Sequence, residues 1–305
     1  MMTKEKEEKQ KEEKQKEGPK TIKEKILSFL KEFGIVFGMF LVINNFVVAS
    51  FLVPTGSMEN EVLTGELLFV NKFIYGGTSP RNVMFTNIRL PWFRLPHIRD
   101  VERGDVIVFV FPGMRDEVHP EDFVFYLKRC VGLPGDTILV KNRILYVNSQ
   151  VMPFPRNTKF DYPLPLPPGQ VELGVFPPGA QWNQDHYGPL VVPKQGMVIP
   201  LNADNFAGWE VFIRREGHSA FLRNGQVFVD GKAVSEYTVQ RDYLFGMGDH
   251  RDNSLDSRYW GFIPKENLVG SPLIVYWSWN SDLPIYDIFG RLGSIRWGRI
   301  GSLIK

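Results

Sequence analysis

A run of 21 residues without a charged side chain, at positions 33–53, constrains this chain more than any other feature. At about 1.5 Å per residue, a helix of this length crosses the hydrocarbon core of a bilayer, which is about 30 Å thick. A cleavable signal peptide has a shorter apolar region, of about 7–15 residues. Asn44 and Asn45 are costly in hydrocarbon, but the length and flanks of the run predict a retained transmembrane anchor.

The charges on either side of this run predict its orientation. Four lysines lie within residues 20–31, ahead of the run, while Glu59 and Glu61 follow it. The positive-inside rule therefore places the N-terminus in the cytoplasm and everything after residue 53 outside. Residues 1–31 are mostly Lys, Glu and Gln, a composition that cannot bury a core and that predicts a solvated tail.

Composition removes several classes of function. The net charge of +2 indicates neither a nucleic-acid partner nor an acidic substrate. Cys130 is the only cysteine, so no intrachain disulfide can form, which fits a reducing compartment or an exported fold that needs no such bond. The five histidines are scattered and form no cluster with metal-ligand spacing, so the sequence predicts no metal and no cofactor.

Beyond residue 53 the pattern is that of β structure. Residues 105–111 and 226–230 are short apolar runs bounded by Gly, Pro and Asn, and Asp230-Gly231 would turn a hairpin. Residues 151–200 hold 11 of the 22 prolines, which indicates an irregular insertion, although residues 187–193 look like a strand that returns to a core. Residues 295–305 mix aromatic, basic and apolar side chains, which suits a membrane-surface segment or a plain tail.

A serine directly after the uncharged run is the first candidate for chemistry. Residues 54–58 read Pro-Thr-Gly-Ser-Met, and Gly56 lets the backbone turn sharply and approach a substrate beside Ser57. Taken alone, this segment is an ordinary turn. It is not the Gly-x-Ser-x-Gly elbow of the α/β-hydrolases.

A lysine that follows an apolar strand is the second candidate. Lys128 comes directly after the apolar residues 123–127, so its side chain must either reach solvent or lose its proton. A desolvated lysine with a lowered pKa can act as general base for a serine hydroxyl. Arg129 is expected on the opposite face of the strand, in solvent.

Residues 246–261 form the third candidate segment, which is dense in Asp, Arg and Ser. Its simplest interpretation is a polar turn network with a salt bridge between Asp256 and Arg258. In chain order, however, the three segments resemble the signature boxes of the bacterial type I signal peptidases. The match runs through residues 54–75, 105–111, 126–136 and 246–270, about a third of the chain, and it follows an anchor as in that family.

This resemblance implies a fold and a function. The fold would be mainly β, a signal-peptidase-type antiparallel β catalytic core with an irregular β insertion, preceded by one N-terminal transmembrane helix. The function would be that of a serine endopeptidase in the bacterial inner membrane, with its catalytic domain on the extracytoplasmic side, that removes signal peptides after Ala-x-Ala-like sites. Its partners would be the signal peptides of secretory preproteins and the phospholipid membrane.

The expected domain organisation has six segments. They are a charged cytoplasmic tail at 1–31, a transmembrane anchor at 32–53, a catalytic core at 54–150 and 206–280, a Pro-rich insertion at 151–205 and a basic, aromatic C-terminal segment at 281–305.

The resemblance also implies roles for individual residues. Ser57 would be the nucleophile and Lys128 the general base, unprotonated in the resting enzyme. Thr55 and the Ser57 N–H would form the oxyanion hole. The supporting residues would be Ser254, which orients the Lys128 amine, Asp256 and Arg258, which form an ion pair, and Gly248, which keeps space beside the lysine. The residues that would line the substrate pockets are Phe51, Val53, Tyr126 and Leu127.

Alternatives remain at this point. His250 stands where the family usually has Asn, which opens a Ser–His interpretation, although no Asp is placed to make a standard triad obvious. A non-catalytic, membrane-tethered module that captures signal peptides is a second function class. A third is a self-cleaving Ser–Lys repressor or mutagenesis protein, which would be cytosolic and would not need the uncharged run.

Overall fold

The computed structural model describes residues 21–79, 93–121 and 123–305, and the chain divides into two compact units, residues 1–45 and 46–305. The uncharged run begins in α2 (Ile22–Phe46), none of whose residues is buried. Thr21 and Glu24 exchange side-chain and backbone hydrogen bonds at its start, the arrangement of a capping box. Within the described part of the chain, α2 is the single helix long and apolar enough to cross a membrane.

The uncharged run does not end as a helix. Residues after Phe46 form β1 (Val48–Leu52), which pairs antiparallel with β2 (Glu66–Asn71), and Leu52 lies opposite Leu67. The anchor expected at 32–53 therefore divides between one helix and one strand. Lack of charge does not distinguish a helix from a strand. The backbone of residues 48–52 forms a strand because its hydrogen-bond partners lie in β2, outside the uncharged run.

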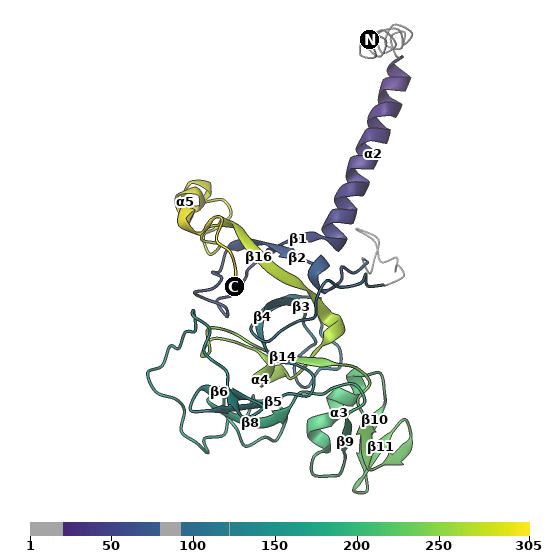
Figure 1. Cartoon of the computed structure of the whole chain (residues 1–305), viewed down its shortest axis with the longest axis vertical. Helices are drawn as coiled ribbons and strands as arrows, with labels where there is room; N and C mark the ends of the chain where they lie inside the picture. Colours follow the sequence, from purple (N-terminus) through teal and green to yellow (C-terminus); the bar gives the residue numbers. More distant parts are fainter. Residues whose placement is uncertain (1–20, 80–92, 122) are drawn as a thin grey trace, which may run out of the picture. The chain divides into compact units, whose positions relative to one another are not determined.

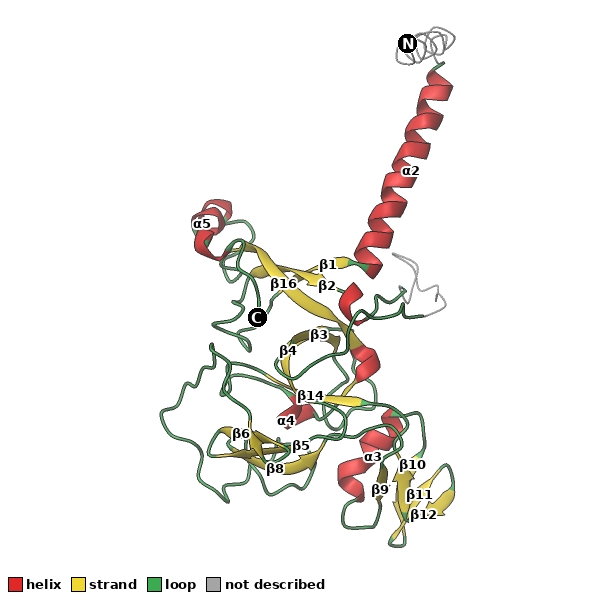
Figure 2. Ribbon diagram, viewed as in Figure 1, coloured by secondary structure: helices red, strands yellow, loops and turns green. Residues whose placement is uncertain are grey.

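A seven-stranded antiparallel sheet carries the fold, in the order β1-β2-β16-β3-β4-β14-β15. The strand β16 (Leu268–Ser278) pairs through its start with β3 (Val106–Val110) and through the rest with β2. Its irregular register lets the sheet curl into a half-barrel (Figure 2). The mainly β, antiparallel fold is confirmed. The other strands of this sheet are β4 (Phe125–Gly132), β14 (Tyr243–Met247) and β15 (Ile263–Pro264).

Smaller sheets complete the second unit (Figure 1). The predicted hairpin is confirmed, since Asp230 and Gly231, at φ 49° and 76°, join β11 (Gln226–Val229) to β12 (Lys232–Val234). The remaining elements are η1 (Phe73–Tyr75), β5 (Thr137–Lys141), β6 (Ile144–Val147), β7 (Gln150–Val151), β8 (His186–Val191), β9 (Val198–Pro200), α3 (Phe206–Arg215), β10 (Ala220–Arg223), β13 (Glu236–Thr238), α4 (Ser257–Trp260), η2 (Lys265–Asn267), α5 (Ile288–Gly293) and η3 (Trp297–Arg299).

The Pro-rich stretch is irregular in its first part and regular at its end. Residues 152–185 contain isolated bridges but no helix or longer strand. The predicted returning strand is β8, which pairs with β5. The irregular path agrees with the density of proline, which cannot donate to a ladder.

A buried apolar cluster lies beneath the turn that holds Ser57. Met58 and Val62, from this turn, are 1% and 0% exposed and pack with valines and a leucine of β2, β3 and β16. Burial of one such side chain contributes about 1.5–3 kcal/mol. The residue after Ser57 is therefore fixed in the core, which holds the serine close to the sheet.

Candidate active site

Ser57 lies in a tight turn between β1 and β2. The Glu59 N–H donates to Gly56 O over 2.9 Å and the Val62 N–H donates to Met58 O over 2.8 Å. Ser57 itself is 8% exposed. Main-chain hydrogen bonds on both sides therefore order the backbone of the serine.

Lys128 approaches this serine from β4. In the sheet, Lys128 lies opposite Ile107 of β3, and it is only 3% exposed. The Nζ atom of Lys128 donates a hydrogen bond to Ser57 Oγ over 2.6 Å. Burial lowers the pKa of Lys128 to about 8, although the negative charge of Asp256 acts in the opposite direction. A neutral amine is thus accessible near physiological pH beside the hydroxyl.

The third segment supports this pair through a buried ion pair. Asp256 caps α4 by accepting a hydrogen bond from the Arg258 N–H, and the Arg258 guanidinium binds the Asp256 carboxylate at 2.9 and 2.8 Å. The Gly248 N–H also donates to Asp256, over 3.0 Å. Burial acts to raise the pKa of Asp256, but Arg258 and Gly248 outweigh it and hold this pKa below its ordinary value. The loop between β14 and α4 is therefore fixed by a charged residue at its end.

Gly248 and Ser254 lie against each other, in an arrangement that differs from expectation. A Cβ atom at Gly248 would lie 2.2 Å from Ser254 Oγ and 2.5 Å from Ser57 O, so only glycine fits. The Ser254 hydroxyl is buried and has no hydrogen-bond partner among the described residues, and the expected bond to Lys128 is not formed. The glycine in direct contact with Lys128 is Gly246, where an added Cβ would lie 3.2 Å from Lys128 Cβ.

The expectation that Arg129 lies in solvent is wrong. This residue is 6% exposed, and its guanidinium binds both carboxylate oxygens of Asp249, at 2.8 and 2.6 Å. Alternation along β4 does turn Arg129 away from the side that Lys128 faces. On the side that Arg129 faces, however, the third segment supplies a buried anion, Asp249. Strand periodicity alone does not reveal such a partner.

His250 does not point to a Ser–His pair. Its backbone N–H donates to Ser57 O over 3.2 Å, but its ring nitrogens face Glu59, at 3.2 Å, and Asp161, at 2.8 Å. The hydroxyl of Ser57 is bonded to Lys128 instead. The geometry therefore favours the Ser–Lys interpretation.

A cavity of about 320 Å³ opens at the Ser57–Lys128 pair. Its lining includes both of these residues, Thr55 and the four side chains expected to contact substrate, which are Phe51, Val53, Tyr126 and Leu127. Several other lining residues were not predicted from the sequence, even though two of them, Asn253 and Leu255, flank Ser254 in the third segment. The lining residues not anticipated are Leu52, Pro54, Met58, Leu68, Val108, Phe125, Asn253 and Leu255.

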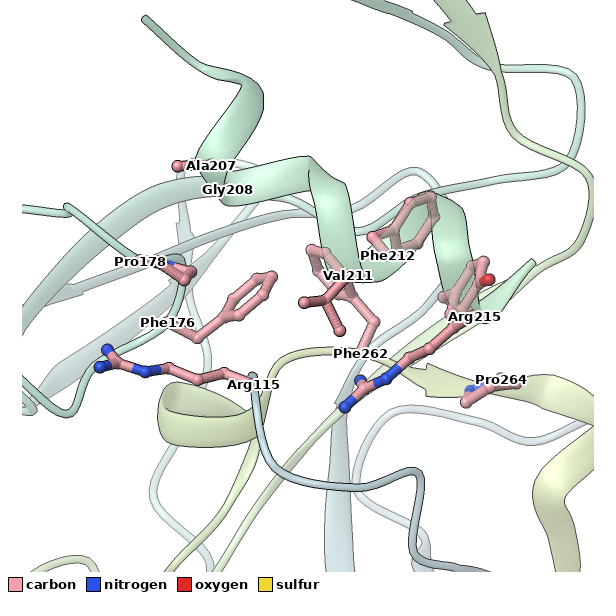
Figure 3. A pocket seen from close by; sticks show the side chains of 11 residues that line it. Arg115, Phe176, Pro178, Ala207, Gly208, Val211, Phe212, Arg215, Phe262 and Pro264 are labelled. Carbon is pink, nitrogen blue, oxygen red and sulfur yellow. The ribbon is translucent and has the colours of Figure 1, made fainter. Parts of the chain in front are cut away.

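A second cavity, beneath α3, is too small for a peptide. Its volume is about 20 Å³, which is room for about one water molecule. Figure 3 shows Phe176, Val211 and Phe262 gathered in it, with Arg115 and Arg215 along one edge. Within the described ranges, no group of three or more His, Cys, Asp or Glu side chains is arranged to hold a metal ion.

Comparison with known proteins gives consistent matches over most of the chain. The family model described as "Signal peptidase, peptidase S26" matches residues 26–277. The signal peptidase I of Pseudomonas aeruginosa is 31% identical over 294 residues, which cover 90% of this chain and 82% of that protein. The signal peptidase I of Helicobacter pylori is 28% identical over 251 residues, 76% of each chain.

A solved structure is also similar to part of the chain. It is a signal peptidase I from Enterococcus faecalis, at 18% identity and a TM-score of 0.26, over 57% of this chain and 97% of that one.

Proposed function

The chain belongs to the signal peptidase S26 family and is a serine peptidase, and we propose that Ser57 is its nucleophile and Lys128 its general base. The contact of 2.6 Å between Lys128 Nζ and Ser57 Oγ, two buried residues at the cavity, carries this proposal. The substrate would be the signal peptide of an exported preprotein, cut after an Ala-x-Ala-like site.

The lowered pKa of Lys128 supports its role as base. With a pKa of about 8, roughly a tenth of the lysines are neutral at pH 7. The neutral amine takes the Ser57 proton as Oγ attacks the scissile carbonyl, and it returns that proton to the leaving amine. It then activates a water that hydrolyses the acyl-enzyme. A lysine of ordinary pKa would be almost fully protonated and could not start this sequence.

The oxyanion would be stabilised by the Ser57 N–H and the Thr55 hydroxyl. Among the residues that the structure describes, none accepts a hydrogen bond from the Ser57 N–H, so this donor is available. Thr55 is exposed and lines the same cavity. One preorganised donor of this kind is typically worth about 3–4 kcal/mol of transition-state stabilisation.

The substrate would bind as an extended strand. The cavity is bordered by residues 51–55, at the end of β1, and by residues 125–128, at the start of β4. A peptide between these two segments would present alternate side chains to the apolar lining. Small residues at alternate positions, as in Ala-x-Ala, suit a cavity of this size.

Membrane anchoring would come from α2, with its lysine-rich start in the cytoplasm. The catalytic core, residues 54–150 and 206–280 around the insertion at 151–205, would then lie on the extracytoplasmic side of a bacterial inner membrane. Near the C-terminus, Tyr286, Ile288 and Phe289 are exposed beside Arg291, a composition that favours contact with a bilayer surface over a plain tail.

Mutation of the dyad tests this proposal. Ser57→Ala and Lys128→Ala are each expected to abolish cleavage of a secretory preprotein while the protein stays folded. Ser235→Ala and Lys232→Ala, at exposed positions, are the matched controls and should cleave normally. Full activity of either dyad variant would overturn the assignment. Binding of an Ala-x-Ala peptide by the wild type without any fragments would favour the capture module, and fractionation to the cytosol would favour the repressor.

A further inference from the structure

Two carboxylates flank the buried ring of His250. Its Nε2 atom lies 2.8 Å from Asp161 Oδ2 and its Nδ1 atom lies 3.2 Å from Glu59 Oε2. Both are ion-pair distances without the alignment of hydrogen bonds. The His250 side chain is 3% exposed, whereas the Asp161 and Glu59 side chains are 43% and 38% exposed. The ring therefore lies beneath two anions at the protein surface.

On one side, His250 contacts the turn of the nucleophile. Glu59 is two residues after Ser57 and closes this turn through its hydrogen bond to Gly56 O. The His250 N–H donates to the carbonyl of Ser57 itself. Main chain and side chain of one histidine thus hold the turn at two points.

On the other side, His250 contacts the Pro-rich insertion. The Lys159 N–H donates to Asp249 O and the Arg251 N–H donates to Lys159 O, both over 2.9 Å, on either side of His250. Lys159 Nζ lies 2.9 Å from Glu59 and 3.7 Å from Asp161. The cluster of His250, Glu59, Lys159 and Asp161 therefore joins the turn to the insertion.

The charge state of His250 decides whether this cluster is attractive. A neutral imidazole has a lone pair on one ring nitrogen, which would face a carboxylate oxygen here, whereas an imidazolium has an N–H on both nitrogens. When His250 is protonated, two anions face two cations. When it is neutral, Lys159 alone opposes both carboxylates. The contact with His250 also holds the pKa of Asp161 below its ordinary value.

The other charged neighbours of His250 in its own segment have partners elsewhere. Asp249 binds Arg129, Asp252 lies 3.6 Å from Arg143, and the Arg251 guanidinium lies over the Phe154 ring at 5.6 Å from its centroid. The groups that face the imidazole are therefore Glu59 from the turn and Lys159 and Asp161 from the insertion.

We propose that protonated His250 is a positioning residue, which fixes the Ser57 turn against the Pro-rich insertion and so raises the rate of acylation. This inference rests on the proposed function, because it assigns His250 a task in presenting Ser57. The residues that line the substrate cavity do not include His250. Loss of its charge should therefore lower kcat and leave KM unchanged.

The test compares the wild type with His250→Gln in kcat and KM for a preprotein between pH 5.5 and 9. At acidic pH, where histidine is protonated, kcat of the variant should be about three- to tenfold lower, with KM unchanged. The ratio of the two kcat values should approach one as pH rises, because a neutral imidazole at position 250 would carry no charge for the variant to remove. The titration of Lys128 cancels in this ratio, since both proteins contain it.

Two further variants make the outcome decisive. Asp161→Asn should reproduce the pH-dependent loss, and the double variant should add nothing to it. The matched control is His97→Gln, because His97 lies 3.6 Å from Asp100 with both side chains more than half exposed, and it should behave as wild type. A ratio that does not change with pH, or an effect on KM alone, would overturn the proposal. Cleavage by Ser57→Ala, measured in parallel, would instead refute the dyad.

Discussion

Lys128 Nζ and Ser57 Oγ lie 2.6 Å apart although the two residues are 71 positions apart in the chain. The sheet produces this contact: β4 carries the lysine, and the residue after the serine is buried against β2 and β3. The residues next to Ser57 and next to Lys128 in the sequence do not by themselves identify either one as catalytic. Several consequences of the arrangement can be measured.

The rate of cleavage should rise with pH through the pKa of Lys128, about 8. The base acts only when deprotonated, so below this pKa kcat/KM should fall about tenfold for each pH unit. The measurement is a pH–rate profile with an Ala-x-Ala substrate. An acid limb centred near 6 or below would exclude Lys128 as the titrating base.

Replacement of Lys128 by methionine should stabilise the protein while it removes activity. The pKa of the buried amine is lower in the folded state than in the unfolded state, so the folded state binds fewer protons between about pH 8 and 10.4 and stability rises with pH there. At neutral pH this difference in pKa lowers the free energy of unfolding by as much as about 3 kcal/mol. Urea unfolding at pH 7 and pH 10 checks it. The stabilisation in Lys128→Met should be largest at pH 7, and no gain at either pH would contradict the assignment.

Gly248→Ala should inactivate the enzyme, because the new methyl group would meet both Ser254 and the carbonyl of Ser57. Overpacking of this kind typically costs about 1–3 kcal/mol, and here it would also move the nucleophile. The matched control is Gly298→Ala, since no atom lies within 4 Å of the added Cβ there. Cleavage assays and thermal unfolding of both variants measure the effect. Normal cleavage by Gly248→Ala would mean that Ser254 and the Ser57 carbonyl can move away from the methyl group without disturbing the nucleophile.

Asp256→Asn should destabilise the protein by about 3–5 kcal/mol, because it leaves the buried guanidinium of Arg258 without its counter-charge. The comparison is Glu210→Gln, which removes an exposed pair with Arg214 at 3.4 Å and should cost about 0.3–0.5 kcal/mol. Chemical denaturation provides both values. Equal effects of the two substitutions would show that the Asp256–Arg258 pair contributes no more than a surface pair.

Much of the fold and part of the site could be predicted from local patterns. The short apolar run at residues 105–111, the Asp-Gly turn at 230–231 and the long uncharged run are each visible in neighbours a few residues away. The resemblance of three segments to a known family then brought Ser57 and Lys128 together with some of the residues that line the cavity, Phe51, Val53 and Tyr126 among them. The pairing of Asp256 with Arg258 could also be predicted, because the two residues are only two positions apart in the chain.

The tertiary structure decided the rest. It ended the helix at Phe46, because β2 supplies hydrogen-bond partners for the next residues. It buried Arg129, since Asp249, 120 residues further along, supplies its counter-charge. It left Ser254 without the expected bond to Lys128 and gave His250 two carboxylate partners. The sequence determined which elements form and which chemical groups they carry, because periodicity and turn chemistry are local. Contacts across the sheet decided which groups meet and which charges are buried. Local sequence patterns carry no information about these contacts.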